Sequence, residues 1–188
     1  MLSQKNSLYN FSIPIKKSTK DEKPYFLFLV PPARVGEILQ KVITNLSEKH
    51  NSPNFEPHIT LLNNVFSDLE TVKQKAKLLA SKLKPILISL GEVSFGANYF
   101  QSVFIRVKAT AELMDLYTLA KEIYLADDNV FMPHMSLIYG NQTMEERKRI
   151  TSAIELPKDI SFEASKLVIV PGTENPDDWI HIEEFDIK

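Results

Sequence analysis

A seven-residue pattern occurs twice in this chain, and no other feature constrains the fold as strongly. It reads aromatic-x-Pro-His-x-(Thr or Ser)-Leu and covers residues 55–61, as FEPHITL, and residues 131–137, as FMPHMSL. Both His residues would carry the preceding Pro and the following hydroxyl in only about one random sequence in a few thousand. The repetition therefore indicates two structurally equivalent segments rather than chance.

The pattern lies inside a longer internal repeat. A Phe lies 30 residues before each of the two His residues, and a hydroxyl residue lies nine residues after each. Around these landmarks, both halves show the same order of an apolar run, a helical pattern, the Pro-His segment, a second helical pattern and closing apolar runs. The landmarks are Phe28 and Ser67 in the first half, and Phe104 and Thr143 in the second.

The patterns predict two β-α-β-α-β halves. In the first half we expect strands at 25–31, 57–62 and 85–96, with helices in 31–50 and 67–83. In the second half we expect strands at 102–109, 133–140, 160–170 and 178–187, with helices in 110–128 and 143–154. Ser67 with Glu70, and Thr143 with Glu146, match the capping box that begins a helix.

The two Pro-His segments are expected to face one cleft. Side chains alternate between the two faces of a strand, so His58 shares a face with Thr60, and His134 shares a face with Ser136. If the halves are related by a pseudo-twofold axis, the equivalent strands lie beside each other. The fold class we expect is therefore α+β, a bilobal duplication in which two sheets line a central cleft.

Two imidazoles and two hydroxyls around one phosphorus atom can form a catalytic group that needs no metal ion or other cofactor. A neutral imidazole can accept a proton from water, and an imidazolium can protonate the leaving oxygen. The hydroxyls can donate hydrogen bonds to the non-bridging phosphoryl oxygens. A cyclic phosphodiester suits this arrangement, because its ring holds the leaving oxygen in place. We take His58 as the acid and His134 as the base, although the residues alone leave this assignment open.

Other chemistries fit the sequence less well. The chain has no nucleophile-elbow pattern, no set of His residues spaced as zinc ligands, no cysteine and only five glycines, which excludes a Gly-rich phosphate loop. His50 follows the basic end of an expected helix, where it would interact with the terminal carbonyls. His181 is expected to lie outside the cleft.

Composition places the chain among ordinary globular proteins. It has 188 residues, 44% hydrophobic and 24% charged, with a net charge of −2. This balance argues against broad nucleic-acid binding but allows a small phosphorylated ligand. We expect a polar N-terminal extension over residues 1–23, one two-lobed domain over 24–188, a monomer, no membrane contact and a cytoplasmic location.

The chain resembles the 2H phosphoesterases, and among them the cyclic phosphodiesterases of plants and yeast. The resemblance covers residues 24–185 and includes FEPHITL, NYFQSVFIRV and FMPHMSLIYG. It implies lobes with an antiparallel sheet and outer helices. It also implies hydrolysis of ADP-ribose 1'',2''-cyclic phosphate to ADP-ribose 1''-phosphate, and of nucleoside 2',3'-cyclic phosphates to 2'-phosphates.

The resemblance also implies roles for individual residues. His58, Thr60, His134 and Ser136 correspond to the family's catalytic residues. Tyr139 corresponds to a phosphate-contacting tyrosine, and Phe100 to an aromatic beside the base or ribose. Phe28 stands where the related plant enzymes have a Trp. Two other functions stay open: a phosphodiesterase acting on RNA ends or 2',5'-oligonucleotides, and a non-catalytic module that binds a cyclic nucleotide.

Overall fold

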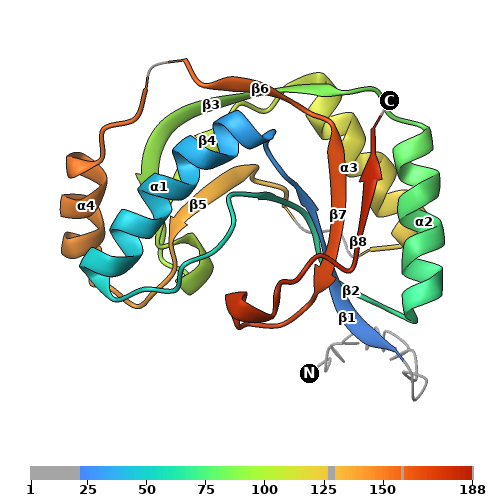
Figure 1. Cartoon of the computed structure of the whole chain (residues 1–188), viewed down its shortest axis with the longest axis horizontal. Coiled ribbons are helices and arrows are strands. Elements are labelled where there is room, and N and C mark those ends of the chain that lie inside the picture. Colours follow the sequence, from blue (N-terminus) through green and yellow to red (C-terminus); the bar gives the residue numbers. More distant parts are fainter. Residues whose placement is uncertain (1–21, 127–129, 158, 188) are drawn as a thin grey trace, which may run out of the picture.

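The computed structural model describes residues 22–126, 130–157 and 159–187. Within them, two four-stranded antiparallel sheets stand side by side, each covered by helices on its outer face (Figure 1). This is the expected two-lobed α+β architecture. The expected N-terminal extension lies outside the described residues except for its last two, and Lys23 already begins the first strand.

Each sheet combines strands from both halves of the sequence. The first sheet has the order β2-β1-β7-β8, and the second has the order β5-β4-β3-β6. The strands of the first sheet are β1 (Lys23–Leu29), β2 (Ile59–Ser67), β7 (Lys166–Pro171) and β8 (Glu183–Asp186). The strands of the second sheet are β3 (Ile86–Phe95), β4 (Val103–Val107), β5 (His134–Ile138) and β6 (Ser161–Ala164).

The closing strands are therefore exchanged between the two halves. We expected β3 to complete the first half, but it pairs with β4, while β7 pairs with β1. Only residues 96–102, which include the short 3-10 helix η1 (Tyr99–Gln101), separate β3 from β4, and a short connection favours antiparallel pairing of the strands that it joins. The exchange ties the two lobes into one domain.

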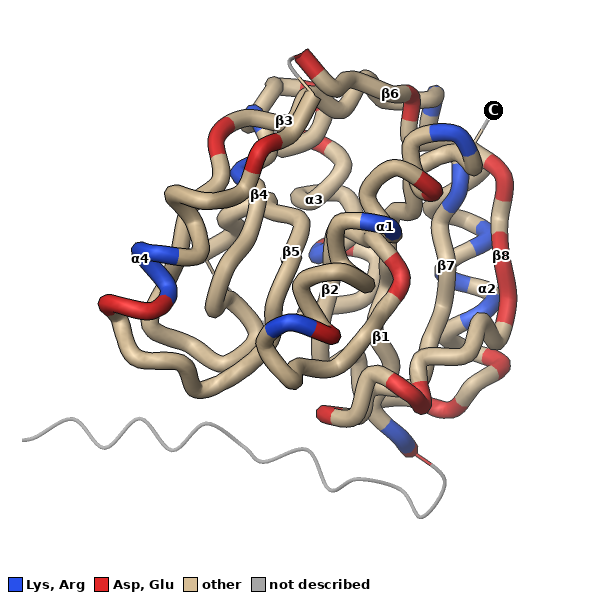
Figure 2. The backbone as a smooth tube through the Cα atoms, turned by 60° about the vertical axis from the view of Figure 1, so that its left-hand side comes forward, with Lys and Arg blue, Asp and Glu red and all other residues tan. Residues whose placement is uncertain are grey.

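Two of the helices, one from each half of the sequence, pack on the sheet of the other lobe. Helices α2 (Leu69–Ser81) and α3 (Ala111–Tyr124) pack on the first sheet, with α3 against β2. Helices α1 (Ala33–His50) and α4 (Met144–Ala153) pack on the second sheet, with α1 against β5. Figure 2 shows the basic α2 beside the acidic β8, where Lys73 and Glu183 form an ion pair of 2.8 Å.

Strand register confirms the internal repeat. Phe28 on β1 is opposite Thr60 on β2, and Phe104 on β4 is opposite Ser136 on β5. The two 30-residue intervals in the sequence thus correspond to the same pair of positions in the two sheets. Each motif strand is an edge strand, and β2 and β5 lie next to each other between the lobes.

The predicted helix cap at Ser67 was wrong. Ser67 does not cap α2, because it remains the last residue of β2 opposite Lys23. The cap is Asp68, whose carboxylate accepts a hydrogen bond of 2.9 Å from the backbone N–H of Thr71. The capping box at Thr143 and Glu146 is confirmed.

The last strand also starts later than expected. A 3-10 helix, η2 (Pro176–Asp178), ends at the first residue of the segment 178–187 in which we predicted a strand, and β8 begins only at Glu183. Pro176 initiates this turn, and the side chain of Asn175 accepts a hydrogen bond from the N–H of Asp177. Residues 179–182 consequently precede β8, and among them the N–H of Ile182 donates to the carbonyl of Ile169 on β7 at 2.9 Å.

The main core fills the space between the sheets and the helices, and a second cluster lies on the other face of the first sheet. This second cluster consists of Phe28, Val30, Val168 and Val170, with Phe26 and Trp179 packed against it. In the described part of the chain, no helix combines the length and the hydropathy that a membrane span requires.

Arg147 connects α4 to the loops beside the cleft through hydrogen bonds. Its side chain is 3% exposed, and its three nitrogens donate to four backbone carbonyls. Nε donates to Gln142 at 2.8 Å, Nη2 to Gly140 at 2.9 Å, and Nη1 to both Gly96 and Asn98. The planar guanidinium thereby fixes the loop between β3 and η1 and the loop that follows β5.

Replacing Arg147 with Lys should destabilise the protein by about 2 kcal/mol. An ammonium group cannot reach all four carbonyls, and the unsatisfied buried acceptors lose part of their hydrogen bonding. Urea unfolding would measure the change. Arg149→Lys, on the exposed face of the same helix, is the matched control and should change stability by less than about 0.5 kcal/mol. Equal effects of the two substitutions would contradict this role of Arg147.

Candidate active site

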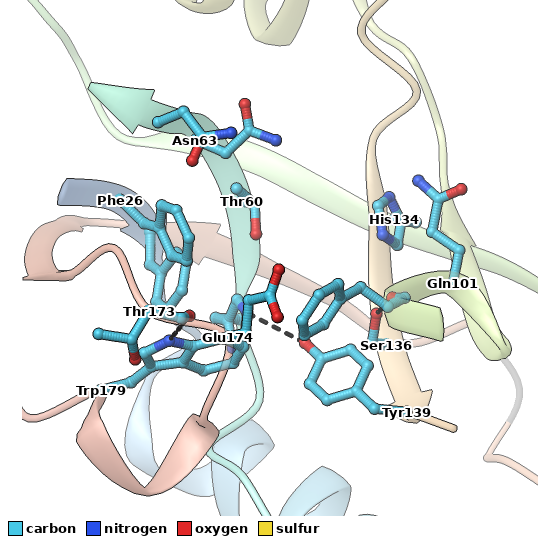
Figure 3. Close-up of a pocket in the computed structure, with 14 residues that line it drawn as sticks. Phe26, Thr60, Asn63, Gln101, His134, Ser136, Tyr139, Thr173, Glu174 and Trp179 are labelled. Atoms are coloured by element: carbon cyan, nitrogen blue, oxygen red, sulfur yellow. Dashed lines mark hydrogen bonds between the residues drawn. The ribbon is translucent and has the colours of Figure 1, made fainter. Parts of the chain in front are cut away.

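One pocket between the two lobes contains all four side chains of the repeated motif. His58 directly precedes β2 and Thr60 lies in it, while His134 and Ser136 lie in β5. Figure 3 shows Thr60 on one side of the pocket, and His134 and Ser136 on the opposite side. The structure therefore brings together the two motifs as the sequence predicted, one from each lobe.

Each imidazole is held by the same backbone contact. Nδ1 of His58 lies 2.7 Å from the carbonyl oxygen of Glu56, and Nδ1 of His134 lies 2.8 Å from that of Met132. A carbonyl can only accept, so Nδ1 carries the proton and donates it. In the neutral ring the lone pair is then on Nε2.

The Pro in each motif explains this contact. A residue before Pro is confined to extended conformations, because the pyrrolidine ring blocks the helical region. Glu56 precedes Pro57 and Met132 precedes Pro133, so both carbonyls belong to extended residues two positions before the His. The same geometry consequently arises in both lobes.

Burial lowers the pKa of both imidazoles. The pKa of His58 falls to about 4, mainly because burial penalises its charged form; the hydrogen bond to Glu56 opposes the shift, and His134 and His181 add to it. The pKa of His134 is also lowered by burial, against its hydrogen bond to Met132. Both rings are therefore neutral at pH 7 in the free protein.

Aromatic rings surround His58 more closely than His134. Phe28 stacks on the His58 ring with centroids 3.8 Å apart, and the Trp179 ring meets it edge-on at 5.4 Å. The hydroxyl of Tyr139 lies 3.5 Å from Nε2 of His58. By contrast, His134 has one ring neighbour, Phe104, at 5.3 Å among the described residues. Because the more enclosed ring is harder to charge, this difference favours His134 as the acid, the reverse of our initial assignment.

The two hydroxyls of the motif differ in their present contacts. Ser136 is buried, and its Oγ donates to the carbonyl of Phe100 at 2.9 Å. Thr60 is partly exposed in the pocket. The three residues that we expected to contact the substrate, Tyr139, Phe100 and Phe28, all line the same pocket. Phe28 stacks on His58 with one face, so it supports the His58 ring as well as forming part of the pocket wall.

Half of the residues that line the pocket were not predicted from the sequence. The remaining residues are Phe26, Asn63, Asn64, Gln101, Thr173, Glu174 and Trp179. Trp179, the single Trp of the chain, was placed in a closing strand; instead it follows η2, and its indole Nε1 donates to the carbonyl of Thr173 at 2.9 Å.

A bulge in β2 accounts for two further lining residues. Residues 25–27 of β1 are opposite residues 62–65 of β2, which is one residue longer, and Asn64 adopts the left-handed conformation with φ of 52°. Asn tolerates this region better than most residues do. Asn63 and Asn64 both reach the pocket, although strict alternation would allow only one of them on this face.

Charge is scarce in the pocket. Its lining, as far as the structure describes the chain, contains one carboxylate, Glu174, and neither Lys nor Arg. His181 does not line it: its ring nitrogens pair with Glu56 at 2.6 Å and with Glu184 at 2.8 Å. Burial opposes a charge on His181, but these two carboxylates outweigh it and raise its pKa. His50 ends α1, as expected, away from the pocket.

Within the three described segments, no group of three or more His, Cys, Asp or Glu residues is arranged to hold a metal ion.

Comparison with known proteins gives one family. A family model described as cyclic phosphodiesterase-like protein matches residues 25–187. The "Cyclic phosphodiesterase" of Arabidopsis thaliana is 26% identical over 125 residues, which are 66% of this chain and 69% of the plant protein. The "2',3'-cyclic-nucleotide 3'-phosphodiesterase" of Yarrowia lipolytica is 33% identical over 141 residues, covering 68% of this chain but only 62% of the yeast protein.

Solved structures share the fold at low sequence identity. TT0787 of Thermus thermophilus superimposes with a TM-score of 0.61 at 17% identity, covering 87% of this chain and 97% of that chain. LigT of E. coli, crystallised with 3'-AMP, has a TM-score of 0.60 at 13% identity, with 89% and 99% covered. These similarities support the two-lobed fold independently of the motifs.

Proposed function

The chain belongs to the cyclic phosphodiesterase-like family of 2H phosphoesterases, and we propose that it hydrolyses cyclic phosphodiesters without a metal ion. The substrates are nucleoside 2',3'-cyclic phosphates, opened to 2'-phosphates, and ADP-ribose 1'',2''-cyclic phosphate, opened to the 1''-phosphate. The observation that carries this proposal is the pair of imidazoles, each with Nδ1 fixed on a carbonyl, in one pocket with two hydroxyls. The name of the Yarrowia relative specifies the 3' ester, whose cleavage leaves a 2'-phosphate.

In the proposed reaction, water attacks phosphorus opposite the leaving oxygen. Nε2 of His58 accepts a proton from the water as its oxygen bonds to phosphorus. Nε2 of protonated His134 donates its proton to the leaving ribose oxygen as the P–O bond breaks. One water is consumed, and the products are a phosphomonoester and a free hydroxyl. Proton exchange with solvent then restores both rings.

Three hydroxyls are placed to bind the non-bridging oxygens. Thr60 and Ser136 donate from opposite lobes, and Ser136 must first leave the Phe100 carbonyl, an exchange of one hydrogen bond for another. Tyr139 supplies the third donor. Its pKa is raised, mainly by burial, so it keeps its proton at neutral pH. Such donors act where charge increases in the transition state.

The aromatic wall suits a nucleobase. Trp179 stands edge-on to Phe26 at 6.1 Å and is tilted against Phe100 at 6.5 Å, leaving ring surface on the pocket side. Stacking on such rings is available to every base, so we expect weak base preference. Phe28 is less available for this purpose because one of its faces is already stacked on His58.

We also propose a cytoplasmic location for the protein. The absence of cysteine in the sequence agrees with this location.

The proposed mechanism predicts turnover of 2',3'-cyclic AMP and of ADP-ribose 1'',2''-cyclic phosphate in the presence of EDTA. His58→Ala and His134→Ala should each lower kcat by about a hundredfold or more, the usual effect of losing a general acid or base. Product formation followed by chromatography would measure this. His50→Ala, outside the pocket, is the control and should retain activity.

Other outcomes of this experiment would identify other functions. Loss of activity in EDTA would contradict metal independence. Turnover of a 2',5'-oligoadenylate in preference to both small substrates would favour the alternative hypothesis of an oligonucleotide phosphodiesterase. Tight binding without product over hours would leave a non-catalytic binding module.

The lowered pKa values predict an acidic pH optimum. In free enzyme the base must be neutral, and the pKa of His58 is about 4; the acid must be protonated, and the pKa of His134 lies below 6.5. The profile of kcat/KM should therefore be bell-shaped with its maximum below pH 6.5. A bound phosphate raises both pKa values, so the profile of kcat should lie at higher pH. A kcat/KM that still rises above pH 7 would contradict the paired-His mechanism.

A further inference from the structure

The second lobe carries a cation beside the pocket where the first lobe carries a hydrocarbon. Arg106 on β4 is directly opposite His134 on β5 and precedes it by 28 residues. The position 28 residues before His58 is Val30, which is buried in the cluster on the first sheet. The internal repeat is thus broken at this point, in the strand next to the motif strand.

Arg106 lies on the cleft-facing side of its sheet. The residues that alternate with it in β4, Val103, Ile105 and Val107, belong to the main core, so Phe104 and Arg106 lie on the other face. The guanidinium carbon lies 5.8 Å from the centroid of the Phe104 ring, and that ring meets the His134 ring edge-on at 5.3 Å. Arg106 therefore continues the wall of the cleft outward from His134.

The present partners of Arg106 hold it weakly. Nη2 donates to Oγ of Ser94 at 3.3 Å, and Nε lies 3.6 Å from a carboxylate oxygen of Glu92. The side chains of Arg106 and Glu92 are 49% and 79% exposed. Ion pairs as long and as exposed as this contribute little to stability. A ligand anion can consequently replace Glu92 at small cost.

The pocket itself offers no equivalent group. Its described lining has no Lys or Arg, and its one carboxylate, Glu174, would repel a further anion. The neutral motif side chains can accommodate the single charge of a cyclic phosphate. A second phosphate on the substrate is better bound at the margin, where Arg106 provides two or more donors in a planar arrangement.

We propose that Arg106, together with Ser94, binds the 5'-phosphoryl group of the ribose whose cyclic phosphate lies between the two His residues. This proposal rests on the proposed function and makes it more specific. Two substrate types share this chemistry: ADP-ribose 1'',2''-cyclic phosphate, where the group is a pyrophosphate, and an oligonucleotide with a cyclic 3' end, where it is a phosphodiester. A cyclic mononucleotide without a 5'-phosphate lacks the contact.

Binding of product analogues tests the proposal without requiring turnover. Calorimetry would compare adenosine 2',5'-bisphosphate with adenosine 2'-phosphate. Wild type should prefer the bisphosphate, and Arg106→Gln should reduce this preference about tenfold, as expected for one charged hydrogen-bonding partner that is half exposed. Arg149→Gln makes the same charge change on α4 and should leave the preference unchanged. Glu92→Gln should increase it, because the competing carboxylate is removed. High salt should weaken it.

The outcomes separate this proposal from the proposed function. If Arg106→Gln lowers the affinity for both nucleotides equally, Arg106 supports Phe104 and His134 rather than binding the 5'-phosphate. If it changes the affinity for neither nucleotide, Arg106 is not part of the site. Either result would overturn the proposal. Turnover of 2',3'-cyclic AMP by the wild-type protein would keep the proposed function intact in both cases. If the preference does fall, kcat/KM for ADP-ribose 1'',2''-cyclic phosphate and for a dinucleotide ending in a 2',3'-cyclic phosphate would show which source of the 5'-phosphoryl group depends more on Arg106.

Discussion

A hydrogen bond from Nδ1 of each motif His to the carbonyl two residues earlier orients the two imidazoles of this protein. It holds the proton on Nδ1 and leaves Nε2 for chemistry, in His58 and in His134 alike. The contact depends on the Pro that precedes each His, because Pro keeps the carbonyl-bearing residue extended. Since both lobes contain this hydrogen bond, either ring can accept or donate a proton at Nε2. The surroundings of each ring determine which role it takes.

The surroundings differ because the duplication is imperfect. Phe28 stacks face to face on His58 at 3.8 Å, whereas its repeat partner Phe104 meets His134 edge-on at 5.3 Å. Trp179 encloses His58 further and has no counterpart against His134 among the described residues. Desolvation therefore acts more strongly on the first ring and lowers its pKa further. In the proposed mechanism this difference makes His58 the base and His134 the acid. The same asymmetry places an apolar wall in the first lobe and Arg106 in the second.

Much of this arrangement could be predicted from the sequence, because the repeat fixes spacing and alternation. The equivalence of Phe28 and Phe104, the shared face of His58 and Thr60, and the capping box at Thr143 all follow from local patterns. The exchange of closing strands could not be predicted, since a repeated pattern reports conformation but not the partner of a strand. The aromatic run YFLFLV hid Phe26 as a pocket residue, because β1 is buried on both faces and shows no alternation. The position of Trp179 was missed for a different reason: the segment WIHIEEF alternates as a strand would, whereas Pro176 begins a turn just before it.

In the proposed mechanism, one phosphoryl group contacts both imidazoles at the same time. NMR titration of His58 and His134, with and without saturating adenosine 2'-phosphate, tests it most directly. In the free protein both pKa values should lie below 6.5, with that of His58 the lower, at about 4. A phosphate dianion bound between the rings should raise both values together, because each ring gains a nearby negative charge. A rise confined to one His would place the phosphate in one lobe only and contradict the account.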